Sequence, residues 1–216
     1  MAEPSTLVIA VDGPAASGKG TIARGLGQHF GLPHLDTGKL YRAVALSLLR
    51  WGGDPESEFA ALRACDEVSG LLDDPELKSE TVGGIASRIS AYPAVRSALL
   101  ERQRDFAAQP GGAVLDGRDI GTVIAPGARA KLFVTASPEE RARRRFAELT
   151  SSGLPVHLDD VLIDIRARDE RDSHRSAAPL VQAEGAMLLD TSAMTAAEAL
   201  AEAIRLVEST FPSQDL

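Results

Sequence analysis

A glycine-rich segment near the start of the chain most constrains what this sequence folds into. Residues 13–21 read GPAASGKGT, directly after an apolar run (TLVIAVD, residues 6–12) and directly before a segment with helical periodicity. The motif GxxxxGK between a strand and a helix forms a loop whose backbone N–H groups, with the helix N-terminus, bind phosphate oxygens. We therefore predict a nucleotide phosphate site in this loop, with the Lys19 ammonium at the β- and γ-phosphates.

The rest of the chain alternates between strand-like and helical segments. The strand-like runs are continuously apolar, as parallel strands covered on both faces are, and lie at residues 6–12, 33–36, 112–116, 131–136 and 186–190. The helical segments lie at residues 18–30, 39–51, 94–108, 137–149, 158–171 and 194–210. This alternation predicts an α/β fold, a five-stranded parallel sheet with helices on both faces. Ligands of such sheets bind at the carboxyl ends of the strands. Four of these ends are acidic, at Asp12, Asp36, Asp116 and Asp190.

Charge and residue content exclude several classes of protein. The formal net charge of -8 argues against binding to long nucleic acids, and the single cysteine, Cys65, excludes an internal disulfide and a multi-thiolate zinc site. No apolar run approaches the roughly 18–20 residues of a membrane span, and the first residues lack the basic stretch of a signal peptide. We expect a cytoplasmic monomer with no nucleic-acid or membrane partner. Because the chain contains no Asn, the Asn-Lys-x-Asp guanine site of GTPases is excluded, and a small kinase is the leading class.

A second anion site is expected opposite the phosphate loop. Arg118 follows the strand that ends at Asp116, and Arg42 lies in the first turns of the helix that follows Asp36. Arginine binds phosphate oxygens at two points, and 19 of the 23 basic residues are Arg. The Asp116 carboxylate is a candidate to hold Mg²⁺ through water. Gly20 stands where the general motif has Ser or Thr, which favours an ion held mostly by nucleotide and water.

Four segments together resemble the bacterial cytidylate kinases, members of the nucleoside monophosphate kinase family of P-loop kinases. They are GPAASGKGT, LDTGKLYR, DGRDIGTV and ARDERDSHRSAAPL, and the likeness extends from about residue 6 to about residue 191. The resemblance implies transfer of the γ-phosphoryl group of ATP, with Mg²⁺, to CMP or dCMP. It also implies a P-loop NTPase architecture in a single kinase domain, residues 1–216. The core would lie at about 5–50, 93–148 and 158–212, the NMP-binding region at about 37–92 and the lid at about 149–158.

The resemblance further implies roles for individual residues. ATP would be bound by Gly13, Pro14, Ala15, Ala16, Ser17, Gly18, Lys19, Gly20, Thr21 and Arg144. CMP would be bound by Thr37, Tyr41, Arg42, Ser87, Arg96, Arg118, Asp119, Arg168, Asp172 and Arg175. Among these, Ser87, Arg96 and Asp119 would contact the cytosine, and Arg168 and Asp172 the sugar. The catalytic groups would be Lys19, Arg118, Arg171 and Arg175, while Arg141, Arg144 or Arg145 would lie at the base of the lid.

Two features depart from the family pattern. Residues 71–84 (LLDDPELKSETVGG) replace a longer β-rich insertion, which leaves the selection of CMP over UMP open, and Thr37 replaces a common Ser but keeps the hydroxyl. Polar stretches at 52–84 and 150–157 are expected to form loops, and His157 and His174 to lie on the surface. The alternatives are a kinase of UMP or AMP, a regulatory P-loop ATP-binding protein without transfer activity, and a nucleic-acid-dependent ATPase.

Overall fold

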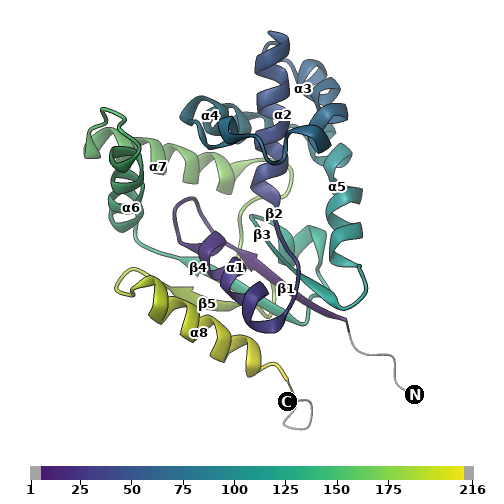
Figure 1. Cartoon of the computed structure of the whole chain (residues 1–216), viewed down its shortest axis with the longest axis vertical. Helices are drawn as coiled ribbons and strands as arrows, with labels where there is room; N and C mark the ends of the chain where they lie inside the picture. The colour runs from purple at the N-terminus through teal and green to yellow at the C-terminus, as the bar shows by residue number, and fades with distance from the viewer. Residues whose placement is uncertain (1–5, 212–216) are drawn as a thin grey trace.

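All strands of the sheet run parallel, in the order β2-β3-β1-β4-β5 (Figure 1). The computed structural model describes residues 6–211. The strands are β1 (Leu7–Asp12), β2 (His34–Asp36), β3 (Gly112–Gly117), β4 (Ala130–Thr135) and β5 (Met187–Asp190). The predicted strands are confirmed to within one residue at each end. Asp116 lies opposite both Asp36 and Val11, so the carboxyl ends of β2, β3 and β1 lie side by side.

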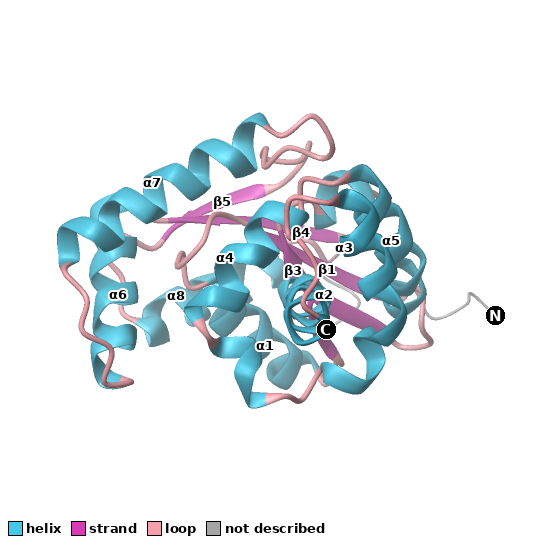
Figure 2. Cartoon of the chain, turned by 90° about the horizontal axis from the view of Figure 1, so that it is seen from above, coloured by secondary structure: helices cyan, strands magenta, loops and turns pink. Residues whose placement is uncertain are grey.

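Helices cover both faces of the sheet, as predicted (Figures 1 and 2). One face packs against α1 (Lys19–Phe30) and α8 (Ala196–Glu208), and the other against α5 (Pro93–Ala107) and the π-helix η3 (Ile120–Ile124). Ile9 of β1 contributes to a buried cluster with Leu26 of α1 and Val207 of α8, whereas Leu115 of β3 packs with Ala107 of α5. Side chains alternate between the two faces along a strand, so each buried strand supplies both cores.

A further apolar cluster lies outside the sheet, around the helix that follows β2. It is built from α2 (Thr37–Trp51), α3 (Glu58–Ala64), η1 (Cys65–Leu71), η2 (Pro75–Lys78) and α4 (Glu80–Ile89). The expectation of a loop over residues 52–84 is therefore wrong. The helices here are too short to show a clear apolar period, yet α3, η2 and α4 each begin at a side chain that caps the helix, Ser57, Asp74 and Ser79 respectively.

Two helices, α6 (Pro138–Ser151) and α7 (Leu158–His174), pack against each other and form an arm at one side of the molecule (Figures 1 and 2). Residues 152–157 join them as the predicted polar loop, beginning only two residues later than expected. The Ser137 side chain caps α6 by accepting from the Glu140 N–H, and the Glu140 carboxylate pairs with Arg144. His157 and His174 are exposed, as expected. Within residues 6–211, no helix has the length and apolar character needed to cross a membrane.

Candidate active site

The phosphate loop lies between β1 and the N-terminus of α1. Gly13 has φ +154° and a Cβ there would lie 2.0 Å from the Val134 carbonyl oxygen, so only glycine fits this close approach. Ser17 is fully buried, and its Oγ has no hydrogen-bond partner among the described residues. The Lys19 ammonium donates to the Pro14 carbonyl at 3.2 Å. The loop therefore has the glycine-dependent shape expected of a phosphate site, with a buried hydroxyl left unpaired.

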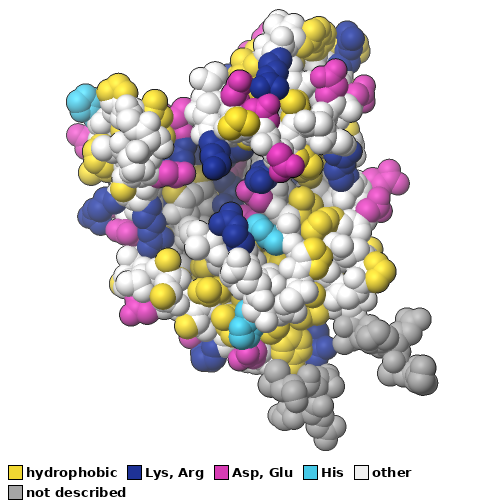
Figure 3. All heavy atoms as spheres, viewed as in Figure 1, with side chains coloured by type: hydrophobic (Ala, Val, Ile, Leu, Met, Phe, Trp, Pro, Cys, Tyr) yellow, Lys and Arg dark blue, Asp and Glu magenta, His cyan; other side chains and the backbone are white. Residues whose placement is uncertain are grey.

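Lys19 belongs to a group of cations that crowd the carboxyl ends of the strands. Burial, followed by the positive charge of Arg118, lowers the pKa of Lys19 to about 7. Burial and the charge of Arg118 likewise lower the pKa of Arg168 to about 10, and the buried Nε of Arg168 has no partner within residues 6–211. Figure 3 shows a hollow on this face, between the α6–α7 arm and the α2–α4 helices, with Lys and Arg side chains around it. Such crowded, partly unpaired cations fit an anionic ligand.

Arg118 is held in this group by an acidic partner on the arm. Its Nε donates to Asp172 Oδ2 at 2.7 Å, with side-chain exposures of 15% for Arg118 and 5% for Asp172. Burial alone would lower the pKa of Arg118, but Asp172 and Asp116 raise it above its ordinary value. Burial would raise the pKa of Asp172, but Arg118 and Arg168 lower it. The pair is therefore ionised, with the Arg118 guanidinium fixed by Asp172.

Arg42 approaches the same space from α2. Its Nη1 donates to the Leu77 carbonyl at 2.7 Å, so η2 holds the side chain in place. Burial, followed by the positive charge of Arg145, lowers the pKa of Arg42, and Arg118 contributes in the same sense. The two arginines expected to bind a second phosphate are thus brought together. Thr37, beside them, donates from Oγ1 to the Asp116 carbonyl at 2.8 Å, which ties α2 to the end of β3.

Two of the residues expected to contact the cytosine, Arg96 and Asp119, form a second group, where α2 and α5 meet the start of η3. Arg96 Nη2 pairs with Asp119 Oδ2, and the Arg96 guanidinium lies 5.7 Å from the Tyr41 ring centroid. Arg175 Nη2 approaches Asp119 Oδ1 at 3.8 Å and has no hydrogen bond to any described residue. These four side chains are buried or nearly so, and they come from α2, α5, the start of η3 and the end of α7.

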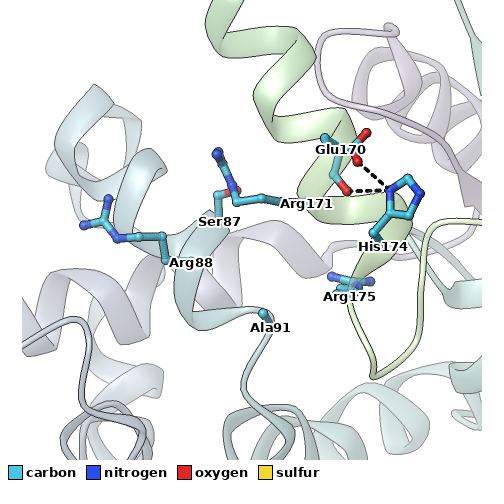
Figure 4. A pocket seen from close by; sticks show the side chains of 7 residues that line it. All are labelled: Ser87, Arg88, Ala91, Glu170, Arg171, His174 and Arg175. Carbon is cyan, nitrogen blue, oxygen red and sulfur yellow. Dashed lines mark hydrogen bonds and ion pairs between the residues drawn. The ribbon is translucent and has the colours of Figure 1, made fainter.

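A pocket of about 350 Å³ opens between α4 and α7, next to this group. Figure 4 shows Arg171 of α7 directed toward Ser87 of α4, and the Arg171 Nη2 lies 3.4 Å from the Ser87 Oγ. Arg175 lies at the base of the pocket, where its Nε donates to the Ala178 carbonyl at 2.6 Å. His174 lines the outer wall and contacts Glu170. The pocket joins the expected cytosine-contacting serine to two of the expected catalytic arginines.

The three arginines considered for the base of the lid have different environments. Arg141 is buried and pairs at two points with Asp169, at 2.9 and 2.6 Å, which makes it a structural link between α6 and α7. Arg144 is held by Thr191, and its Nη1 lies 3.8 Å from where a Cβ of Gly18 would be. Arg144 therefore lies against the phosphate loop, as expected of an ATP contact. Thr21 of the ATP set, by contrast, is exposed on the first turn of α1.

Arg145, the third of these arginines, bridges the two sides of the site. It pairs with Glu80 at the start of α4 and with Glu148 one turn further along α6. The sequence suggested no partner for it, because Glu80 lies in the stretch that was expected to be a loop. The arm is thus tied to α4 at this pair and at the contact between Arg171 and Ser87.

Asp12 also has a role that the sequence did not indicate beyond its place at a strand end. Its two carboxylate oxygens accept hydrogen bonds from the backbone N–H groups of Ile120 and Gly121, at 2.8 and 2.7 Å. Burial raises the pKa of Asp12 to about 6, although these N–H groups oppose the shift. The contacts fix the first turn of η3 against β1, directly after Arg118 and Asp119.

The strand ends fit Mg²⁺ by the chemistry of their donor atoms. Carboxylate oxygens are hard ligands, and Asp36 and Asp116 lie opposite each other next to Lys19. Residues 6–211 contain no group of three or more His, Cys, Asp or Glu side chains placed to enclose a metal. An ion here would therefore have most of its ligands from phosphate and water, with Asp116 as the expected protein contact.

A parallel sheet whose strand ends place a phosphate loop opposite a second arginine-rich anion site is the architecture of P-loop kinases that act on nucleoside monophosphates. Within that class, the cytidylate kinase family model matches residues 9–209. The chain belongs to the cytidylate kinase family.

Individual relatives agree with this assignment. A cytidylate kinase of Xanthobacter autotrophicus is 58% identical over 204 residues, covering 94% of this chain and 98% of that protein. One from a Caulobacter species is 54% identical, covering 94% of each chain, and one from a Methylobacterium species is 60% identical, covering 83% and 86%. The crystal structure of TT1252 from Thermus thermophilus covers 97% of this chain and 100% of its own, at 22% identity and a TM-score of 0.49. That distant likeness adds nothing to the assignment.

Proposed function

We propose that this chain is a cytidylate kinase that transfers the γ-phosphoryl group of ATP to CMP or dCMP, producing ADP and CDP or dCDP. Membership of the family supports the reaction. The observation that carries it is the pair of facing anion sites. Lys19 in the phosphate loop and Arg118 opposite it lie close enough for the positive charge of Arg118 to lower the pKa of Lys19. An ATP-binding switch without transfer activity has no need of the second site.

The acceptor provides its own nucleophile. A nucleotide phosphate has a second pKa of about 6 and is largely a dianion at neutral pH, so no general base is required. A phosphate oxygen of CMP attacks the γ-phosphorus as the bond from that phosphorus to the β,γ-bridging oxygen breaks, and ADP leaves with the electron pair. Lys19 and Arg118, with Arg171 and Arg175 from the arm, would orient the groups and stabilise the charge that spreads over the transferred phosphoryl.

Mg²⁺, when bound with ATP, would supply positive charge at the β- and γ-phosphate oxygens. Asp116 would hold it through water at the end of β3. The phosphate loop from Gly13 to Thr21 would bind the ATP phosphates, and Arg144 would contact the nucleotide from α6. Arg42 would hold the CMP phosphate together with Arg118, next to Thr37.

Cytosine selection would depend on Asp119, Arg96 and Ser87. Cytosine presents an amino group at N4 and acceptors at N3 and O2, whereas uracil presents an acceptor at O4 and a donor at N3. The Asp119 carboxylate accepts from the cytosine amino group but repels the O4 of uracil. The Arg96 guanidinium, fixed by Asp119 and Tyr41, donates to the acceptors of cytosine. Arg168, Asp172 and Arg175 would contact the sugar and the outer side of the base.

The division of the chain follows from these roles. We assign residues 37–92 to CMP binding because they have their own apolar cluster beside the sheet. We assign the lid to residues 149–158, with α6 and α7 carrying its arginines. Closure of the lid would exclude water from the phosphoryl group. Limited proteolysis near residues 151–153 tests this, because ATP plus CMP together should slow cleavage and either nucleotide alone should not.

The remaining assignments concern the compartment, the oligomeric state and the partners of the chain. We assign it to the cytoplasm as a monomer that acts on free nucleotides. A net charge of -8 and a single half-buried Cys65 support this assignment. Size-exclusion chromatography with light scattering, together with a filter-binding test on single-stranded RNA, would test it.

The deciding experiment measures ADP formation with ATP, Mg²⁺ and each of CMP, dCMP, UMP, AMP and GMP in turn. Turnover confined to CMP and dCMP, and lost in Lys19→Ala, is the expected result. Equal turnover with UMP would retain the chemistry but contradict the base selection by Asp119 and Arg96. ATP binding without turnover of any acceptor would favour the regulatory alternative, and activity dependent on added RNA or DNA would favour the ATPase.

A further inference from the structure

A half-buried histidine contacts the carboxylate that is expected to hold Mg²⁺. His34 Nε2 donates to Asp116 Oδ1 at 2.7 Å, with side-chain exposures of 16% and 4%. The geometry points to His34 as a positioning residue that holds the Asp116 carboxylate so that its second oxygen faces the phosphate loop. This inference rests on the proposed function, because it concerns how the same site binds ATP with its cation.

The sheet register brings the two residues together. His34 lies opposite Val114, and Asp36 lies opposite Asp116, so Asp116 is two residues beyond the partner of His34 on the neighbouring strand. Side chains two residues apart on a strand point to the same face. Both side chains therefore lie on the α1 face, where the His34 ring crosses from β2 to reach Asp116 on β3.

The base of the histidine side chain lies close to α1 at Gly27. A Cβ on Gly27 would lie 3.4 Å from the His34 Cβ and 2.9 Å from the Leu32 carbonyl oxygen. The absence of a side chain at Gly27 lets β2 approach α1 closely, so the His34 side chain starts against α1 and its ring is held at Asp116 on β3. A confined donor restricts the rotation of its acceptor more than a mobile surface side chain does.

The remaining contacts of Asp116 leave one carboxylate oxygen facing the loop. Its backbone carbonyl accepts from Thr37 Oγ1 at 2.8 Å, and its Oδ1 accepts from His34. Its Oδ2 lies 3.6 Å from where a Cβ of Gly20 would be. Gly20 is the loop position at which the general motif has a hydroxyl for the cation. In this chain the oxygen next to Gly20 is Oδ2 of Asp116. The hydrogen bond from His34 to Oδ1 leaves Oδ2 as the oxygen that faces the loop.

A fixed orientation matters because a carboxylate that can rotate loses part of its advantage as a ligand. Hydrogen-bond partners of metal-binding side chains affect metal affinity by roughly 10- to 100-fold when removed. Asp116 would act through water, which places the expected effect at the lower end of this range, about tenfold. The effect should be confined to binding that involves the cation, because the CMP site does not contact His34.

The test is the affinity for ATP measured by calorimetry with Mg²⁺ and with EDTA, using the full chain without CMP. His34→Leu and His34→Asn leave no donor at the position of the histidine Nε2, whereas His34→Gln places its amide N–H close to that position. His29→Leu is the matched control, because His29 pairs with Glu208 at 3.3 Å on the exposed side of α1. Thermal unfolding of each variant identifies any that do not fold. If His34→Leu does not fold, the comparison of His34→Asn with His34→Gln still tests the inference.

We expect the gain in ATP affinity from Mg²⁺ to fall about tenfold in the Leu and Asn variants and to be largely restored in the Gln variant. Affinity in EDTA and affinity for CMP should stay at the wild-type values, and His29→Leu should resemble the wild type throughout. An unchanged Mg²⁺ effect in Leu and Asn would overturn the inference, as would equal losses with Mg²⁺ and EDTA or a Gln variant no better than Asn. Because none of these readouts uses turnover of CMP, failure of the proposed reaction would be detected separately, in the wild-type assay.

Discussion

Arg118 and Asp172 join the end of β3 to the last turns of α7 through a buried ion pair, with the Arg118 Nε donating to Asp172 Oδ2 at 2.7 Å. The contact connects the sheet, which carries the phosphate loop, with the arm, which carries Arg168 and Arg171. The position of the arm over the site thus depends on a largely buried charge pair.

Removing one member of this pair should destabilise the fold. Asp172→Ala leaves the Arg118 guanidinium buried without its partner, and breaking a buried pair in this way costs about 3–5 kcal/mol. Urea denaturation measures the loss. The control is Glu139→Ala, which removes the exposed partner of Arg166 on the same arm and should leave stability unchanged. A loss for Asp172→Ala no larger than that of the control would contradict the buried character of the pair.

ATP binding should take up a proton above neutral pH. The pKa of Lys19 is lowered to about 7 in the free protein, and the phosphates of ATP favour the ammonium form. At pH 8 the uptake should approach one proton, and affinity should weaken roughly fivefold between pH 7 and pH 8. Calorimetry in two buffers of different ionisation enthalpy measures the uptake. Lys19→Arg, whose guanidinium stays protonated, should remove it, and uptake that persists in that variant would refute the assignment to Lys19.

Asp12 should make the fold less stable as the pH rises from about 4 to about 6. Its pKa is raised from the ordinary 3.8 to about 6 in the folded protein, so the folded state holds the extra proton in this range. The contribution is present below the unfolded pKa and is lost as pH rises through the folded pKa, by at most about 3 kcal/mol.

The measurement is the difference in unfolding free energy between wild type and Asp12→Asn across this pH range, which cancels the other carboxylates. As the pH rises, the unfolding free energy of the wild type should fall relative to that of Asp12→Asn. Asp190→Asn at the end of β5 is the control, because hydrogen bonds from Ser192 lower the pKa of Asp190, so its stabilising contribution is lost only below about pH 4 and its difference should stay nearly flat in this range. A flat difference for Asp12→Asn would show that its carboxyl titrates normally.

Arg144→Ala should weaken ATP binding and leave CMP binding unchanged. Thr191 holds the Arg144 guanidinium against Gly18 of the phosphate loop, and loss of a charged hydrogen bond to the nucleotide is worth about tenfold in affinity. Separate KM values for ATP and CMP measure the effect. Arg143→Ala, one residue earlier on α6 and exposed, is the matched control. Equal changes in both KM values would indicate a general disturbance of the arm instead of an ATP contact.

The sequence by itself determined the sheet, the phosphate loop and the facing arginines. The strands are short and continuously apolar, and the loop chemistry depends on neighbours in the chain, so local pattern was sufficient for both. Arg42 and Arg118 could be placed for the same reason: each follows a strand end, and the carboxyl ends of parallel strands lie together.

Only the tertiary structure decided which residue each of the other charged groups meets. Arg141, Arg144 and Arg145 lie on neighbouring positions of one helix face, and their spacing does not distinguish them. Their partners distinguish them. Arg141 pairs with Asp169 and links α6 to α7, Arg144 is held by Thr191 next to the phosphate loop, and Arg145 pairs with Glu80 across the site. His34 and Asp116 are 82 residues apart. Such contacts depend on strand order, register and helix packing, which no local pattern in the sequence contains.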